Sequence, residues 1–188
     1  MMIELSVVFT ARNDNYGGNL LHRVQTSIDS ILQLGERCGL DGEIILVEWN
    51  PPTDKVSLAT ALDWPANLNH MSARVITVPN EIHERYPNSD RIPLFEYIAK
   101  NTGVRRADSE FVLSTNPDLI YSEDLLKFFA GGNLDPNCFY RIHRYDVDRM
   151  VPLEASVDER ELFAESHVFK YSTVHDGYVA TDRTTMFR

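Results

Sequence analysis

The sequence predicts an α/β fold with a mostly parallel central sheet flanked by helices. Short apolar runs alternate with segments whose apolar residues recur every three or four positions, which is the order of strand–helix–strand units with right-handed crossovers. The first run, Ile3 to Thr10, lacks the alternation of a half-exposed strand and so indicates a strand covered on both faces. Predicted strands also end in polar residues, at the edge where open α/β sheets bind ligands.

The first helix is expected to follow the polar segment 11–18, in which Gly17 and Gly18 permit positive φ. Apolar residues at three- and four-residue spacing give this helix one buried face: Leu20, Leu21, Val24, Ile28, Ile31 and Leu32. Gly35 or Gly39 is expected to end it, because glycine readily adopts the left-handed conformation that follows a helix.

The later elements continue this alternation up to a short, less regular C-terminal part. The expected order is a strand at Glu43–Val47, a helix at Val56–Leu62, a strand at Arg74–Val78, a helix from Pro93, a strand at Phe111–Ser114, a helix after the N-cap Ser122, and a strand at Cys138–Ile142. The polar segment 80–90 is expected to be an exposed loop. Asp176 and Gly177, between β-prone runs, predict a hairpin turn.

The length of 188 residues predicts a single domain, with a core over 1–146 and a C-terminal extension over 147–188. Its two cysteines, Cys38 and Cys138, are too few for a disulfide framework, so a reducing compartment is expected. The N-terminal apolar run is too short to span a bilayer and lacks the basic flank of a signal peptide. The protein is therefore expected to be soluble and cytoplasmic, with no transmembrane segment.

The charge balance argues against one class of partner. Eighteen basic and 28 acidic residues give a formal net charge of −10, which repels a nucleic-acid backbone unless the basic groups are strongly clustered. We therefore expect no nucleic-acid partner. A nucleotide ligand remains compatible with this charge, because a divalent cation can bridge carboxylates and phosphates.

The segment 110–123 contains the most informative corner of the sequence. The apolar strand at Phe111–Ser114 runs directly into Thr115-Asn116-Pro117-Asp118, which places the carboxylate of Asp118 just beyond the end of a core strand. Asn-Pro and Pro-Asp are also ordinary turn formers, so a turn and a ligand site are both open interpretations. Two more polar clusters follow predicted strands, at 10–13 and 48–50, and neighbouring parallel strands would bring all three clusters to one edge of the sheet.

In this order and spacing, four parts of the chain resemble the nucleotide-sugar glycosyltransferases of the GT-A fold, particularly the family-2-like group. These parts are the opening SVVFTARND, the strand EIILVEWN with its acidic end, the helical segment AKNTGVRRADSEF, and the STNPD corner, which stands where that family has its DxD motif. The resemblance covers roughly residues 3–146. It implies a nucleotide-diphosphate sugar, with UDP or GDP as the nucleotide, as donor, and sugar transfer to an unidentified acceptor.

The resemblance and the converging strand ends together supply the expected site residues. The expected nucleotide-binding residues are Thr10, Arg12, Asn13, Glu48, Arg91 and Asn116. Asp118 and Asn116 are the implied ligands of Mg²⁺ or Mn²⁺, which would bridge the diphosphate and neutralise the charge that develops on it as it leaves.

The sequence departs from the family pattern in two ways. Asn116 replaces an acidic residue, which lowers the negative charge available to a metal. The chain is also short after the corner, where the family has its catalytic base. The available carboxylates there are Asp146, Asp148, Glu154, Asp158 and Glu159, and no motif selects one of them, so no catalytic residue is assigned.

Both departures favour a rival interpretation, a noncatalytic or partial GT-A-like module that binds a nucleotide and needs another chain for the acceptor site. A third interpretation, a nucleotidyltransferase, ranks lower. Its opening loop should be Gly-rich and basic to hold a triphosphate, whereas segment 12–18 contains a single cation, Arg12.

Overall fold

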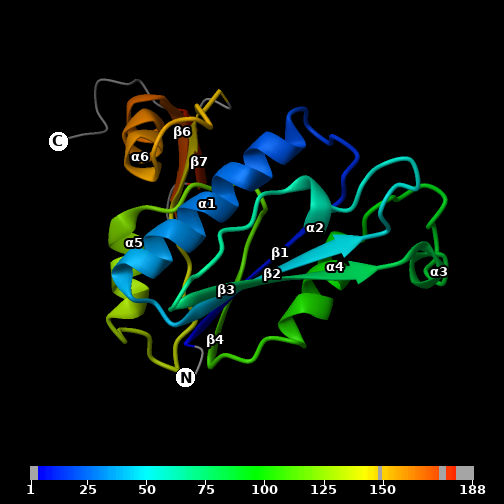
Figure 1. Ribbon diagram of the computed structural model, residues 1–188, viewed down its shortest axis with the longest axis horizontal. Helices are drawn as coiled ribbons and strands as arrows, with labels where there is room; N and C mark the ends of the chain where they lie inside the picture. Colours follow the sequence, from blue (N-terminus) through cyan, green and yellow to red (C-terminus); the bar gives the residue numbers. More distant parts are fainter. Residues whose placement is uncertain (1–3, 148–149, 174–176, 181–188) are drawn as a thin grey trace. The chain divides into compact units, whose positions relative to one another are not determined.

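The computed structural model describes residues 4–147, 150–173 and 177–180, and the chain divides into two compact units between Leu134 and Asp135. The first unit contains β1 (Leu5–Ala11), α1 (Leu20–Cys38), β2 (Gly42–Trp49), α2 (Leu58–Ala61), β3 (Met71–Val78), α3 (Asn80–His83), α4 (Glu96–Val104), β4 (Phe111–Ser114) and α5 (Glu123–Ala130). Its four strands form one all-parallel sheet in the order β3-β2-β1-β4, with α1 and α4 on opposite faces (Figure 1). The predicted α/β fold is confirmed, and its strand order is Rossmann-like.

Strands β1 and β2 form the centre of the sheet. Every residue of both strands is buried, including the polar Ser6, Thr10, Glu43 and Glu48, which explains why their sequences are mostly apolar and lack the alternation of a half-exposed strand. They pair in parallel register from Leu5 with Gly42 to Ala11 with Glu48. The strand predictions for this region are therefore confirmed, and β2 extends the predicted strand by two residues at its carboxyl end.

Helix α1 covers one face of the sheet. Its buried positions include Val24, Ile28 and Ile31, as the three- and four-residue spacing predicts. It ends at Cys38, and Gly39 follows with φ 70°, donating its N–H back to the carbonyls of Gly35 and Glu36. This confirms Gly39 as the end of the helix.

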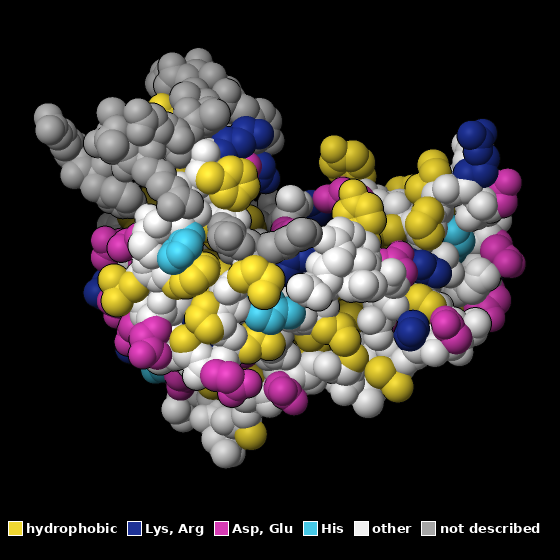
Figure 2. Space-filling view, turned by 90° about the horizontal axis from the view of Figure 1, so that it is seen from above, with side chains coloured by type: hydrophobic (Ala, Val, Ile, Leu, Met, Phe, Trp, Pro, Cys, Tyr) yellow, Lys and Arg dark blue, Asp and Glu magenta, His cyan; other side chains and the backbone are white. Residues whose placement is uncertain are grey.

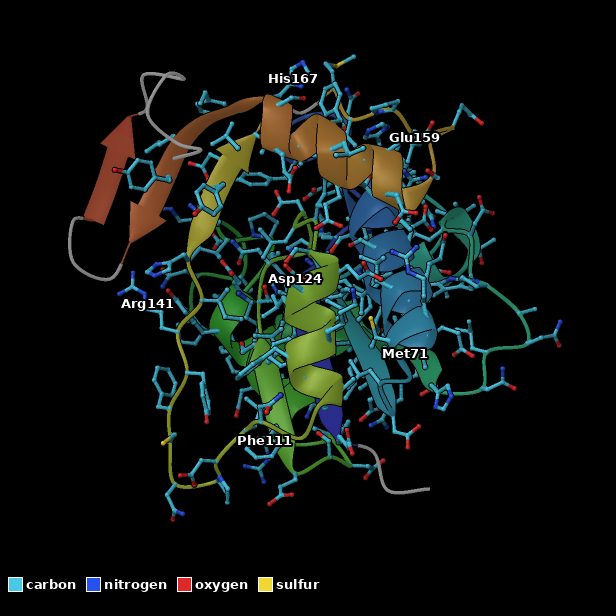
Figure 3. The ribbon with its side chains drawn as sticks, turned by 90° about the vertical axis from the view of Figure 1, so that its left-hand side faces the viewer. Met71, Phe111, Asp124, Arg141, Glu159 and His167 are labelled. Atoms are coloured by element: carbon cyan, nitrogen blue, oxygen red, sulfur yellow. The ribbon has the colours of Figure 1, made fainter. Side chains whose placement is uncertain are left out.

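Glycines allow this helix to approach the edge strand β3 closely. A Cβ added to Gly35 would lie 2.7 Å from Met71 Sδ, so only a glycine leaves room for the methionine. Met71 lies beside the C-terminal half of α1, and α5 runs next to α1 (Figure 3).

Helix α4 covers the opposite face. The buried residues of this face are Val8, Ile45, Val47, Trp49, Val78 and Ala99. Gly103 lies directly on the sheet, where an added Cβ would be 2.5 Å from Val8 Cγ1 and 3.1 Å from Val47 Cγ2. The absence of a side chain at Gly103 therefore sets how closely α4 packs against β1 and β2.

The strand order creates a switch point at the carboxyl edge of the sheet. From β1 the chain moves outward through β2 to β3, and then returns across the other face to place β4 on the free side of β1. The crossover helix α1 that follows β1 and the crossover helix α4 that precedes β4 therefore lie on opposite faces, and ligands of open α/β sheets bind at the carboxyl edge where the strand order reverses in this way.

Two local predictions need correction in this unit. Helix α4 begins at Glu96, not at Pro93, and Pro93 uses its carbonyl to accept a bond from Asn50 Nδ2 at 3.0 Å. The segment 80–90 is not entirely a loop, because its first four residues form α3. By contrast Ser122 is the N-cap of α5 as predicted, with its side chain accepting the Leu125 N–H.

The second unit contains β5 (Arg144–Val147), α6 (Val157–Ser166), β6 (Val168–Thr173) and β7 (Gly177–Ala180), with the three strands in one antiparallel sheet. The predicted strand at 138–142 is wrong, because the strand starts at Arg144. Phe139, in the predicted segment, is 96% exposed, so its apolar side chain is not part of a core. The C-terminal hairpin is confirmed as β6 paired with β7. Asp176 of the predicted turn lies outside the described residues.

At the start of β3, the carboxylate of Glu36 in α1 accepts several backbone hydrogen bonds. It accepts from the N–H groups of Asn69, His70 and Met71 and from Asn69 Nδ2. Burial alone would raise the pKa of Glu36, but these hydrogen bonds outweigh it and lower the pKa from 4.5 to about 2. The ionised carboxylate thereby fastens the turn before β3 to α1.

We predict that Gly103→Ala destabilises the first unit. An overpacked core position costs about 1–3 kcal/mol, whereas replacing glycine by alanine inside a helix gains only about 0.5–1 kcal/mol. The cost of the clash should exceed this gain, because Val8 and Val47 are both fully buried in the packed centre of the sheet. Urea unfolding should show a lower midpoint, while Asn101→Ala, an exposed change in the same helix, should not lower it. An unchanged midpoint for Gly103→Ala would contradict the close packing of α4.

We predict that Glu36→Gln reduces the acid sensitivity of the fold. The folded-state pKa is depressed, so the stability that Glu36 contributes is present above pH 4.5 and is lost as the pH falls toward about 2. The free energy of unfolding of the unmodified protein should therefore fall more steeply through this window than that of Glu36→Gln. Glu110→Gln, a change at an exposed glutamate, serves as control, and a slope for Glu36→Gln equal to that of the unmodified protein would refute the assignment.

Candidate functional site

The loop after β1 has an unusual backbone. Asn15, Gly17, Gly18 and Asn19 all have positive φ, between 51° and 76°. The Asn15 side chain accepts the N–H of Leu20, the first residue of α1, at 3.2 Å. The glycine pair thus has the conformation that the sequence analysis allowed for, and the loop ends in a defined geometry against α1.

Arg12 and Asn13, two of the predicted site residues, connect this loop to the loop after β2. Arg12 donates through Nε to the Asn50 carbonyl at 2.6 Å and pairs through Nη1 with Asp14 at 2.8 Å. Asn13 donates through Nδ2 to the Val56 carbonyl at 2.9 Å. The side chain of Asn50 continues the connection to Pro93, so the loops after β1, β2 and β3 are joined at the carboxyl edge.

Thr10 and Glu48, also predicted to contact a nucleotide, are turned inward. The Thr10 hydroxyl donates to the Val47 carbonyl at 2.7 Å, and Glu48 Oε1 accepts the Leu58 N–H at 2.8 Å. Burial raises the pKa of the Glu48 carboxyl, while the Leu58 N–H and the Thr77 side chain act in the opposite direction. Both side chains are buried and bond to backbone groups, so they stabilise the carboxyl edge of the sheet.

The corner after β4 is held by a cation from α1. Asp118 Oδ2 pairs with Arg23 Nη1, and the same guanidinium donates to the Tyr16 and Gly18 carbonyls of the β1 loop. A Cβ on Gly17 would lie 2.9 Å from Arg23 Nη2, so glycine is what allows this close approach. Arg23 therefore joins the two loops that border the switch point.

A second cation reaches the same corner from α4 on the other face. Lys100 Nζ donates to Asn116 Oδ1 at 3.1 Å and pairs with Glu96, one helical turn earlier, at 2.6 Å. The side chains of Arg12, Arg23 and Lys100 are only 19%, 18% and 14% exposed. Three largely buried cations are thus placed around the carboxyl ends of β1 and β4.

This arrangement does not fit the metal site that the DxD resemblance implies. Over 4–147, 150–173 and 177–180 no group of three or more His, Cys, Asp or Glu is placed to hold a metal ion. Both predicted ligands, Asp118 and Asn116, are already bonded to cations. Unit charges 4 Å apart repel by about 4 kcal/mol at an effective dielectric of 20, and a divalent ion beside Arg23 would feel about twice that.

Arg91 lies in the turn before α4. Its backbone N–H donates to the Asn88 carbonyl at 3.0 Å, and its side chain is exposed. Of the predicted residues, the structure groups Arg12 and Asn13 at the joined loops and Asn116 and Asp118 at the corner, whereas, among the described residues, the Arg91 side chain forms no hydrogen bond or ion pair with either group.

The sequence analysis missed Arg23 and Lys100. Arg23 falls off the apolar face of α1, as a solvated helix residue does, and its partner Asp118 is 95 positions away in the chain. Lys100 follows Glu96 at the spacing of an ordinary surface pair on a helix. Only the fold brings these cations to the corner.

His83 is buried, with only 2% of its surface exposed. Its Nδ1 accepts the Trp49 Nε1–H at 2.8 Å, and its Nε2 contacts the Ser89 carbonyl at 3.0 Å. Trp49 also packs against the rings of Tyr86 and Phe95 and is only 1% exposed, so it is a core residue. This cluster supports the carboxyl end of β2 from the α4 face.

The charged surface is mixed. On the face shown in Figure 2, Lys and Arg side chains of the described residues occur singly or in small groups among Asp and Glu. That face therefore carries no extended basic area of the kind that a nucleic acid requires. Within the same described part of the chain, no helix is both long and apolar enough to cross a membrane.

Comparison with known proteins adds no family. No family model matches the chain, and no curated protein matches it.

We predict that Glu48→Gln changes the pH dependence of stability in the direction opposite to Glu36→Gln. Because the folded-state pKa is raised, the contribution of Glu48 is fully present below pH 4.5 and is lost as the pH rises through the raised pKa. The variant has no charge to bury, so its free energy of unfolding should fall less between pH 4.5 and neutrality. Denaturant unfolding across this range checks this, with Glu110→Gln as control. Parallel stability profiles for the variant and the unmodified protein would mean that folding does not raise the pKa of Glu48.

Proposed function

We propose that the chain binds a nucleotide-diphosphate sugar at the carboxyl edge of the parallel sheet and transfers the sugar to an acceptor. One observation carries this proposal: at the carboxyl ends of β1 and β4, largely buried cations from a loop and from two helices are held in place by carboxylates, Arg12 by Asp14, Arg23 by Asp118 and Lys100 by Glu96. A diphosphate carries charge of the opposite sign and offers oxygens to arginine and lysine donors. The resemblance to GT-A glycosyltransferases implies a donor at the same corner, which supports the proposal.

The transfer itself is a substitution at the anomeric carbon of the sugar. The bond between that carbon and the diphosphate oxygen breaks, the nucleotide diphosphate leaves with the electron pair, and an acceptor hydroxyl oxygen forms the new bond while losing its proton to a base. The cations of the corner serve this step by stabilising charge that develops on the leaving diphosphate. The acceptor and the base are not assigned to residues.

A nucleotide-binding module without catalysis is the second candidate. The pairing of Asp118 with Arg23 favours it, because the carboxylate that the family uses for its metal is engaged within the chain. Such a module would need another chain to supply the acceptor site.

A cytoplasmic location is part of the proposal. Cys38 and Cys138 are both free thiols, which supports a reducing compartment.

Nucleotide binding is the first test of the proposed function. UDP and GDP are titrated calorimetrically into the full chain with excess MnCl₂, so that any metal requirement is met. We expect one of them to bind, with a dissociation constant of about 1 μM–1 mM, the range usual for enzyme substrates. Arg12→Ala should weaken that binding by about 10-fold or more, since a hydrogen bond to a charged group is worth about 1.5–3 kcal/mol.

Arg105→Ala is the matched control, because Arg105 is an exposed arginine at the C-terminal end of α4. It should leave binding unchanged, and circular dichroism should show that both variants are folded. A second step incubates the protein with UDP-glucose and GDP-mannose and measures release of the nucleotide diphosphate. Binding without release favours the noncatalytic module, and no binding of either nucleotide refutes the proposed function.

A further inference from the structure

We infer that this site binds its diphosphate without a divalent metal, using Arg23 and Lys100 in the place of the ion. The inference rests on the proposed function and goes beyond it, because it exchanges the expected Mg²⁺ or Mn²⁺ for side chains of the chain itself. Its starting point is that Asp118 and Asn116, the implied metal ligands, are bonded to Arg23 and Lys100.

The two cations bond directly to the two residues that are the implied metal ligands. They come from opposite faces of the sheet, Arg23 from α1 and Lys100 from α4, and meet the two polar residues of one short corner. A ligand at this corner would therefore lie between two cations, each of which is also paired with a carboxylate, Arg23 with Asp118 and Lys100 with Glu96. Both tasks of a metal, holding the diphosphate and neutralising charge on it, are within the chemistry of a guanidinium and an ammonium.

Arg23 is held in a defined orientation before any ligand binds. Its Nε and Nη2 donate to the Gly18 and Tyr16 carbonyls, and its Nη1 donates to the Asp118 carboxylate. Such a fixed guanidinium loses little conformational entropy on binding, and these three bonds leave two of its five N–H groups to donate to phosphate oxygens. Asp118 is then a positioning residue that orients Arg23.

Burial strengthens both cations as anion-binding groups. Their side chains are 18% and 14% exposed, so water screens them less than ordinary surface charges. The backbone next to Arg23 also leaves room for a ligand, because a Cβ built on Gly18 has no atom within 4 Å. Open space therefore lies beside the Gly18 backbone, whose carbonyl accepts from Arg23 Nε.

The test compares UDP and GDP binding to the full chain in EDTA and in excess MnCl₂. We expect the nucleotide that binds to do so with the same dissociation constant, within about 2-fold, in both conditions. Arg23→Ala and Lys100→Ala should each weaken binding by about 10-fold or more in EDTA, as expected for loss of a charge-assisted hydrogen bond. Arg105→Ala should bind as the unmodified protein does.

Asp118→Asn separates the two roles of this residue. As a positioning residue it should weaken binding less than Arg23→Ala and leave the indifference to Mn²⁺ intact. As a metal ligand it should abolish a Mn²⁺-dependent increase in affinity. The unmodified protein carries the decisive comparison, so the test stands even if Arg23→Ala fails to fold.

The outcomes are distinct. Binding that requires Mn²⁺, or Arg23→Ala and Lys100→Ala variants that fold and bind normally, overturns this inference and leaves the proposed function standing. No binding in either condition overturns both. Equal binding with and without metal, weakened in both variants, supports both.

Discussion

The parallel pairing of β1 with β2 is the interaction on which the rest of the first unit depends. Both strands are buried along their whole length, so each face needs a cover, which α1 provides on one side and α4 on the other. The return of the chain across the second face then places β4 beside β1. The polar corner and the loop after β1 become neighbours as a direct result.

The site edge is built by side chains that bond to backbone carbonyls of other loops. Arg12 bonds to Asn50, Asn13 to Val56, and Arg23 to Tyr16. Each of these donors satisfies a carbonyl that no strand or helix uses, which is the usual way for irregular segments to meet their hydrogen-bonding needs. The same bonds orient the cations that would face a ligand, so structural and binding roles are combined in these residues.

The sequence is informative where structure follows from nearby residues. Val24, Ile28 and Ile31 predict the buried face of α1, and Gly39 marks its end, because both depend on local spacing and backbone conformation. The apolar segment 138–142 is not a strand, since apolar character alone does not provide a partner strand. The pairing of Arg23 with Asp118 could not be predicted, because it depends on how α1 and β4 meet across the sheet.

The buried ring of His83 helps to restrict the segment that carries Arg91. His83 Nε2 contacts the Ser89 carbonyl, and Asn50 donates to the Pro93 carbonyl. The three residues between them, 90–92, therefore form a short segment that is anchored at both ends. A short tethered segment samples far fewer conformations than a free loop of the same composition. If the exposed Arg91 side chain binds an anion, the backbone that carries it therefore loses little further conformational entropy, because folding has already restricted it.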